Sequence, residues 1–111
     1  MSAIALVYVL YGDRLAAEQA ARDMVEQRLA ACANLLGDSQ SFYRWEGEIE
    51  DAREVPVLFK TAPDRREALM AALSRDHGYA LPAILSWSAE ATADYAAWVA
   101  RETQLDVDPP A

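Results

Sequence analysis

The segment Phe42-Tyr43-Arg44-Trp45-Glu46-Gly47-Glu48-Ile49-Glu50 (FYRWEGEIE) decides how this chain folds. It carries three aromatic residues within four positions, which favours extended structure. Gly47 tolerates the positive φ that a tight reversal needs, and a second β-rich run follows at residues 55–61. The segment therefore predicts a long β-hairpin with Trp45 and Glu46 at its tip. Such an arm has unpaired edges, and a neighbouring subunit is the usual cover for them.

The chain before the hairpin is typical of a strand, a helix and a second strand. Residues 3–10 are continuously apolar, which indicates a strand buried on both faces. Asp13 can cap a helix over residues 14–30, where apolar side chains recur every three or four positions. Residues 32–45 then form the second strand, with a break or bulge at Gly37-Asp38-Ser39.

The third strand and the second helix follow the hairpin turn. The third strand covers residues 48–61 and contains Pro56, which cannot donate a backbone hydrogen bond. The nitrogen side of Pro56 should therefore face an edge or a bulge. Residues 64–67 (DRRE) match a capping pattern and predict a helix that runs to about Asp76.

A fourth short strand at residues 83–87 and a last helix capped by Ser88 complete a single domain, expected to span residues 1–105. Residues 106–111 contain two prolines and predict a frayed tail. The element order is thus β-α-β-β-α-β plus a terminal helix. With right-handed crossovers, this order predicts an α+β fold of the ferredoxin-like kind, an antiparallel sheet with two helices on one face and an extra C-terminal helix.

Composition restricts the partners of this domain. Ten Lys and Arg against eighteen Asp and Glu give a formal charge of −8, which argues against nucleic acid and anionic membranes as partners. Cys32 is the only cysteine, so no intrachain disulfide can form, and its apolar neighbours favour a small core thiol over a reactive one. The first ten residues lack the features of a signal peptide, and no apolar run reaches the roughly 20 residues of a membrane span. We expect a cytoplasmic protein.

Four blocks of sequence resemble a known family. They are QRLAACAN at residues 27–34, YRWEG at 43–47, LFKT at 58–61, and His77-Gly78-Tyr79 with Pro82. In residues and in spacing they are similar to the CutA divalent-ion tolerance proteins. The resemblance implies a ferredoxin-like subunit in a tight homotrimer, with long hairpins that pair across subunits. It also implies a role in the response to divalent metal ions, copper among them, through binding and not through an enzymatic reaction.

Several positions depart from the family pattern. Val9 stands where the family often carries a cysteine considered a copper ligand, and Ala83 stands where a glutamate is usual. Gly12 replaces the proline of a Pro-Asp pair, and Gly78 replaces the proline of a His-Pro-Tyr motif. The blocks that resemble the family scaffold are thus retained, while two candidate ligands are absent.

His77 is the only histidine and the only candidate metal ligand that the sequence singles out. Imidazole suits copper and zinc, but one histidine makes a poor site alone, so neighbouring carboxylates or a partner's hairpin tip would have to complete it. The alternative is a loop histidine that is hydrogen-bonded to its neighbours. No cofactor is expected to be required beyond such a cation.

A cleft between subunits is the second candidate site. The resemblance implies that it is lined by Tyr43, Trp45, Lys60 and Tyr79, together with His77. A lysine among aromatic rings could receive an organic anion such as a carboxylate. The alternatives are that Lys60 only extends its amine to solvent at a strand end, and that Tyr43 and Trp45 anchor a subunit interface.

Three hypotheses of function remain open at this stage. The first is a CutA-like homotrimer that binds divalent cations. The second is a trimeric sensor of a small organic anion, because the trimer that the resemblance implies is similar to the PII signalling proteins. The third is a small dimeric α/β-barrel enzyme, which shares this element order. Against catalysis, the sequence contains no nucleophile motif to accompany its single histidine.

Overall fold

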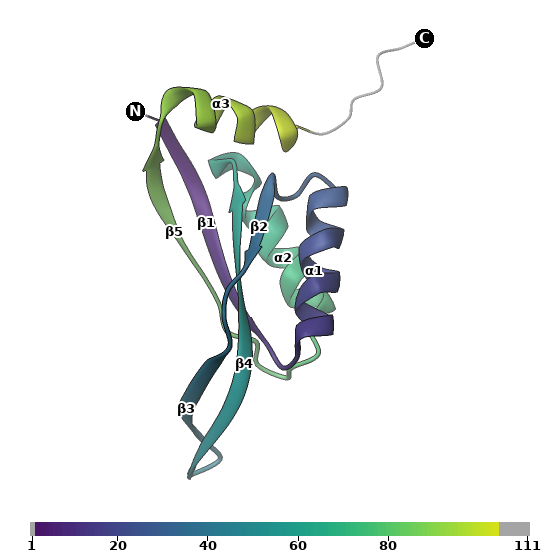
Figure 1. The fold of residues 1–111 in the computed structure, drawn as a ribbon, viewed down its shortest axis with the longest axis vertical. Coiled ribbons are helices and arrows are strands. Elements are labelled where there is room, and N and C mark those ends of the chain that lie inside the picture. The colour runs from purple at the N-terminus through teal and green to yellow at the C-terminus, as the bar shows by residue number, and fades with distance from the viewer. Residues whose placement is uncertain (1, 105–111) are drawn as a thin grey trace.

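The computed structural model describes residues 2–104, and these form one α+β domain (Figure 1). Its elements are β1 (Ser2–Tyr11), α1 (Arg14–Glu26), β2 (Cys32–Leu35), β3 (Ser39–Trp45), β4 (Glu48–Thr61), the 3₁₀ turn η1 (Pro63–Arg65), α2 (Arg66–Asp76), β5 (Ile84–Ala91) and α3 (Ala93–Glu102). The expected order of strands and helices is confirmed. The expected tail at residues 106–111 lies outside the described residues.

The strands form one antiparallel sheet in the order β2-β4-β1-β5, and β3 pairs with the outer half of β4. This half of β4 and β3 form an arm, residues 39–54, that extends away from the helices (Figure 1). The helices α1 and α2 lie on one face of the sheet, whereas α3 crosses its far end (Figure 1). The ferredoxin-like plan predicted from the element order is therefore confirmed, with an arm added to it.

The main core lies between the sheet and the helices α1 and α2. Alternate residues of β1 and β4 face it, because successive side chains of a strand point to opposite sides. Its fully or almost fully buried side chains include Val7, Val9, Val57 and Phe59 from the strands and Met24, Leu69 and Leu73 from the helices. A smaller cluster joins α3 to the opposite face of the sheet through Ile4, Ala31, Ala96 and Val99.

The hairpin turn has the geometry that its sequence predicts. Glu46 has φ 50° and Gly47 has φ 82°, so both central residues lie in the left-handed region. Two such residues form the tight turn that matches the right-handed twist of the flanking strands. The register Trp45 to Glu48 closes directly across this turn.

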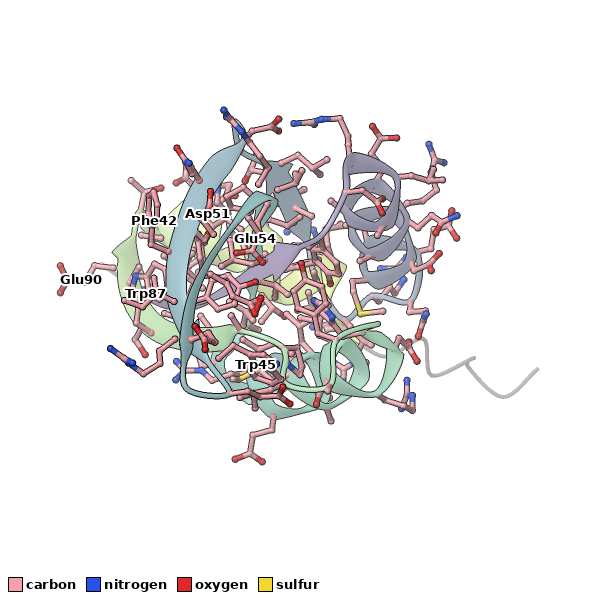
Figure 2. The ribbon with its side chains drawn as sticks, turned by 90° about the horizontal axis from the view of Figure 1, so that it is seen from below. Phe42, Trp45, Asp51, Glu54, Trp87 and Glu90 are labelled. Atoms are coloured by element: carbon pink, nitrogen blue, oxygen red, sulfur yellow. The ribbon has the colours of Figure 1, made fainter. Side chains whose placement is uncertain are left out.

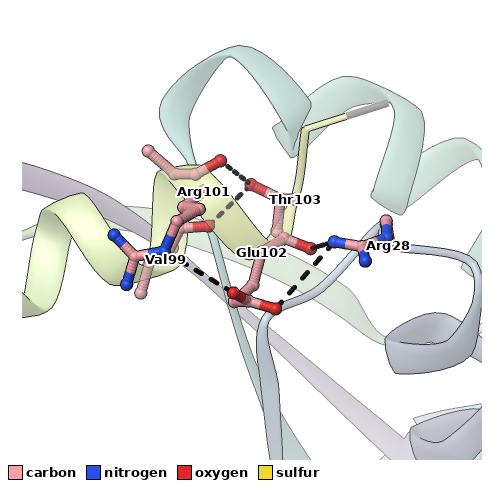
Figure 3. Close-up of polar contacts among 6 residues, drawn as sticks. Arg28, Val99, Arg101, Glu102 and Thr103 are labelled. Carbon is pink, nitrogen blue, oxygen red and sulfur yellow. Dashed lines mark hydrogen bonds and ion pairs between the residues drawn. The ribbon is translucent and has the colours of Figure 1, made fainter. Parts of the chain in front are cut away.

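The first helix ends earlier than its apolar pattern predicts. The expected helix at residues 14–30 stops at Glu26, because Arg28 takes the left-handed conformation with φ 59°. The backbone N–H groups of Leu29 and Ala30 then both donate to the carbonyl oxygen of Met24, which closes the helix end. The Arg28 guanidinium also donates to the carbonyl oxygen of Glu102 at 3.4 Å and so ties this turn to the end of α3 (Figure 3).

Pro56 sits where the neighbouring strand is interrupted, as its missing donor requires. The expected break separates β2 from β3, and Leu36 in this break donates its N–H to the carbonyl oxygen of Pro56 at 2.9 Å. In a regular antiparallel pair the carbonyl of Leu36 would receive a bond in return. Arg14 from α1 supplies it instead, with Nη2 at 3.4 Å from that oxygen.

Two predicted helix caps are wrong. Asp64 does not cap α2, because η1 precedes the helix and the capping position is held by Arg65, which makes no side-chain capping bond. Ser88 does not cap α3, because β5 continues to Ala91 and the helix starts after Thr92. In the second case, strand pairing with β1 over a longer range overrides the local pattern. The predicted cap at Asp13 is confirmed, since its carboxylate accepts from the N–H of Ala16 at 2.8 Å.

Candidate functional site

His77 lies at the end of α2 with both ring nitrogens hydrogen-bonded within the chain. Nε2 is 2.8 Å from the carbonyl oxygen of Leu10, and Nδ1 accepts the backbone N–H of Tyr79 at 3.1 Å. The neutral ring with its proton on Nε2 satisfies both bonds. The ring also stacks on Tyr11, with centroids 4.6 Å apart and planes 13° from parallel. Within one chain, His77 is thus a loop histidine that is bonded to its neighbours.

Tyr79 continues this set of contacts to the base of the arm. Its hydroxyl donates to Oε2 of Glu54 at 3.1 Å, and the Glu54 side chain is only 7% exposed. Desolvation, followed by the hydrogen bond and the negative charge of Glu54, raises the pKa of Tyr79 to about 12. Burial, with a smaller contribution from Asp76, raises the pKa of Tyr11 to about 12. Both tyrosines are thus held in their neutral, hydrogen-donating form.

These residues do not form a ready cation site within one chain. Val9, His77 and Ala83 do converge, because His77 and Ala83 each contact the backbone of Leu10, the neighbour of Val9. Val9 is fully buried in the core, however, and neither it nor Ala83 has a side-chain ligand atom. Among residues 2–104, no three His, Cys, Asp or Glu side chains gather closely enough to hold a metal ion. A cation at His77 would have to take a nitrogen that is already hydrogen-bonded.

Lys60 lies apart from the other predicted cleft residues in a single chain. It pairs with Leu6 on β1 and Cys32 on β2, and its Nζ is 6.0 Å from the ring centre of Tyr95 on α3. Glu54, which contacts Tyr79, is six positions earlier on β4, or roughly 20 Å along an extended strand. Cys32 is half-buried beside Lys60 and so lies outside the core predicted for it.

The two aromatic residues of the arm share one of its faces. Tyr43 and Trp45 are 40% and 39% exposed, and they pair with Glu50 and Glu48 across the hairpin. Tyr43 of the arm is close enough to Tyr79 for its charge to contribute to the raised pKa of Tyr79, so Lys60, near α3, is the residue that lies apart from the other predicted cleft residues. A cleft that uses all five residues needs contributions from more than one copy of the chain.

The structure adds Glu54 and Tyr11 to the residues that matter here. Glu54 lies in the middle of the molecule when it is viewed along the arm, whereas Glu90 on β5 points outward (Figure 2). The signal in the sequence was a charged residue directly before the buried run at residues 55–59. Its partner Tyr79 is 25 positions away, so no local pattern could identify the contact.

The sheet face opposite α1 and α2 is apolar and largely uncovered. Opposed residues in antiparallel pairs share a face, so the register places the same row of side chains on this side of β1, β4 and β5. We call this surface the open face; its apolar members are Leu6, Tyr8, Leu10, Leu58, Leu85 and Trp87, and Lys60, which pairs with Leu6, lies among them. Leu85 and Trp87 remain 50% and 42% exposed, because α3 covers only the end near Ile4.

A family model for CutA1 divalent ion tolerance proteins matches residues 5–102. The chain belongs to this family. A divalent-cation tolerance protein CutA from Pyrococcus horikoshii is 36% identical over 100 residues, covering 89% of this chain and 97% of its own length. One from Yersinia pestis is 34% identical over 88 residues, covering 78% of this chain and 74% of its own.

Solved structures of the family have the same fold as this chain. A point variant of Pyrococcus horikoshii CutA1 superposes with a TM-score of 0.86 at 35% identity, over 90% of this chain and 98% of that one. The protein from Ehrlichia chaffeensis gives a TM-score of 0.87 at 29% identity, over 92% and 96% of the two chains. The sequence blocks that suggested the family therefore identified it correctly.

Proposed function

We propose that this chain assembles as a homotrimer and acts in divalent metal ion tolerance by binding, without catalysis of its own. The observation that carries the proposal is the open face together with the arm. Leu85 and Trp87 remain exposed on the open face, and the outer edge of β3 has no partner strand among residues 2–104. Association of copies would remove both from water.

A matched pair of variants tests the assembly. Leu85 on the open face is 50% exposed and Leu15 on α1 is 65% exposed. Leu85→Asp places a charge in the proposed interface and should convert the trimer to smaller species, whereas Leu15→Asp should leave the mass unchanged. Light scattering coupled to size-exclusion chromatography measures both. A wild-type mass of one chain, or of two chains as in a barrel dimer, would contradict the proposal.

A divalent cation, copper included, is the ligand that the proposal assigns to the region of His77. Because one chain supplies a single imidazole, acidic residues from the hairpin tip of a partner, Glu46 and Glu48, would complete the site. Titration calorimetry with copper and zinc should detect binding that His77→Ala abolishes and that Glu90→Gln, a change at an outward-pointing carboxylate, does not affect. Equal binding by the His77 variant would exclude this ligand.

The second candidate is a sensor of a small organic anion, favoured by the environment of Lys60. Its ammonium lies near the Tyr95 ring and forms no ion pair with any residue of the described chain. A half-buried ammonium of this kind is a receptor for a carboxylate. Thermal stabilisation by carboxylates but not by metals, lost in Lys60→Met, would favour this function over cation binding.

We propose a cytoplasmic location, which fits a chain whose single cysteine can form no intrachain disulfide. No helix among residues 2–104 is long and apolar enough to cross a membrane. A family member from Archaeoglobus fulgidus, 25% identical with a TM-score of 0.87, is described as periplasmic. Fractionation of cells that express this chain, followed by immunoblotting, tests the assignment.

A further inference from the structure

Glu54 is the first residue of β4, counted toward the hairpin tip, that no longer pairs with β1. Val55 is paired with Tyr11 of β1, whereas Glu54 is paired with Ser39 of β3. From this residue outward, β4 leaves the sheet and becomes the arm (Figure 1). Among the described residues β3 pairs only with β4, so the direction of the arm is decided by what holds this junction.

A continuous set of contacts connects the junction to the body of the domain. The Tyr79 hydroxyl donates to Glu54, the Tyr79 backbone N–H donates to His77, and His77 bonds to the carbonyl oxygen of Leu10. The rings of Tyr11 and Tyr79 both contact the His77 ring, with their centroids 4.6 Å and 4.7 Å from its centroid. We call the four side chains Tyr11, His77, Tyr79 and Glu54 the clasp.

The hydrogen bond from Tyr79 to Glu54 is the contact that resists opening of the clasp. A carboxylate that is only 7% exposed needs a hydrogen-bond donor, and Tyr79 is the donor that residues 2–104 provide to its side chain. Without that hydroxyl, Oε2 of Glu54 loses its donor in a residue that is 7% exposed, and opening the junction would give this oxygen water in exchange. Opening the junction changes the direction of the arm.

We propose that the clasp is a conformational device that fixes the direction of the arm and so presents the free edge of β3 to a second copy of the chain. Tyr79 and Glu54 act as positioning residues in this device, and neither has to contact the second copy. The link to a second copy depends on the homotrimer proposed above, whereas the hold on the arm does not.

Hydrogen exchange of the full-length protein tests the hold directly. Tyr79→Phe keeps the ring against His77 and removes only the donor to Glu54, so the amides of residues 39–54 should exchange about tenfold faster. Amides of β1 and β5 supply the internal reference and should change little. Thr103→Val is the control, because it removes a buried hydroxyl donor at the end of α3, far from the arm, and should leave the arm unchanged.

Two further variants separate the device from a general loss of stability. Glu54→Gln keeps an acceptor for the Tyr79 hydroxyl and should protect the arm almost as well as wild type. In Gly12→Ala, the new Cβ would stand 3.1 Å from the Tyr79 hydroxyl oxygen, which crowds the clasp from the end of β1. This variant should also speed exchange in the arm, without removing any hydrogen-bonding group.

The outcomes divide cleanly between the two proposals. Unchanged arm exchange in Tyr79→Phe, or an equal rise in β1, β5 and the arm, would overturn the clasp. A wild-type protein that is not trimeric, with arm exchange still accelerated in Tyr79→Phe, would overturn the assembly and keep the hold on the arm. A trimer that weakens in Tyr79→Phe as the arm loosens would support both.

Discussion

Two buried threonines offer a matched test of how this fold satisfies its backbone. Thr61 and Thr103 are 0% and 1% exposed, and each donates its hydroxyl to a carbonyl oxygen: Thr61 to Leu29 at 2.7 Å, and Thr103 to Val99 at 2.8 Å. The two acceptors differ. The carbonyl of Val99 also accepts the N–H of Thr103 itself, whereas Thr61 is the only donor to Leu29 among the described residues.

Replacement by valine removes each hydroxyl and keeps the shape of the side chain. In Thr61→Val the carbonyl of Leu29 loses its donor, which costs about 1–3 kcal/mol, and the added methyl group returns roughly 1 kcal/mol. We expect Thr61→Val to lower the free energy of unfolding by up to about 2 kcal/mol. Thr103→Val leaves its acceptor bonded and should change that free energy by no more than about 0.5 kcal/mol.

Urea unfolding, followed by circular dichroism at a fixed protein concentration, measures both variants. The fixed concentration matters because the stability of an oligomer depends on it. Equal losses of unfolding free energy in the two variants would refute the reasoning. The loss would then depend on burial of the hydroxyl and not on whether the carbonyl acceptor keeps another donor. A loss confined to Thr103→Val would refute it more strongly.

Three other predictions follow from single features of the structure. Gly47→Ala places a residue with a β-carbon at φ 82° in the hairpin turn and should lower the free energy of unfolding by roughly 1 kcal/mol, measured by urea unfolding. An unchanged free energy would show that Gly47 does not hold this turn conformation. Phe59→Ala empties a fully buried site and should cost about 3–5 kcal/mol in the same assay, against less than about 1 kcal/mol for exposed Phe42→Ala. The pKa of Tyr11 rises from 10 to about 12 on folding. The neutral Tyr11 hydroxyl therefore contributes about 2–3 kcal/mol to the free energy of unfolding below pH 10, and this contribution is lost as the pH approaches 12. Urea unfolding at about pH 9 and about pH 11.5 should therefore show that the free energy of unfolding falls less with pH in Tyr11→Phe than in wild type. An equal fall in both proteins would contradict the raised pKa of Tyr11.

The turn of the hairpin was predictable to the residue because its determinants are local, whereas β3 begins at Ser39, inside the predicted break. Glu46 and Gly47 alone set the reversal, and the aromatic run sets the strand before it. The helix ends were less predictable. The left-handed residue after α1 is Arg28 and not a glycine, so the sequence carries no stop signal there, and the apolar pattern continues past the true end.

The extent of β5 shows a different limit. Ser88 is a good capping residue, yet β5 runs to Ala91 because β1 offers pairing as far as Ser2. Strand length here is decided by a partner more than 80 positions earlier in the chain, and no window of local sequence contains that information. The same reason hides the contact between Glu54 and Tyr79, which is visible only once β4 and the loop after α2 are placed together.

The candidate site was predicted as a set of residue types, and the structure shows why type alone does not define a site. Imidazole nitrogens bind cations when a lone pair is free, and in His77 the lone pair of Nδ1 already accepts the N–H of Tyr79. Any ligand that takes this nitrogen therefore competes with the hydrogen bond that positions Tyr79, and through it with the hold on Glu54. Occupation of His77 and closure of the clasp then oppose each other in free energy, and by linkage each weakens the other by the same factor. Variants that loosen the clasp while keeping the imidazole, such as Tyr79→Phe, should accordingly bind a cation at His77 more tightly than wild type, and a weaker or equal affinity would show that the two are independent.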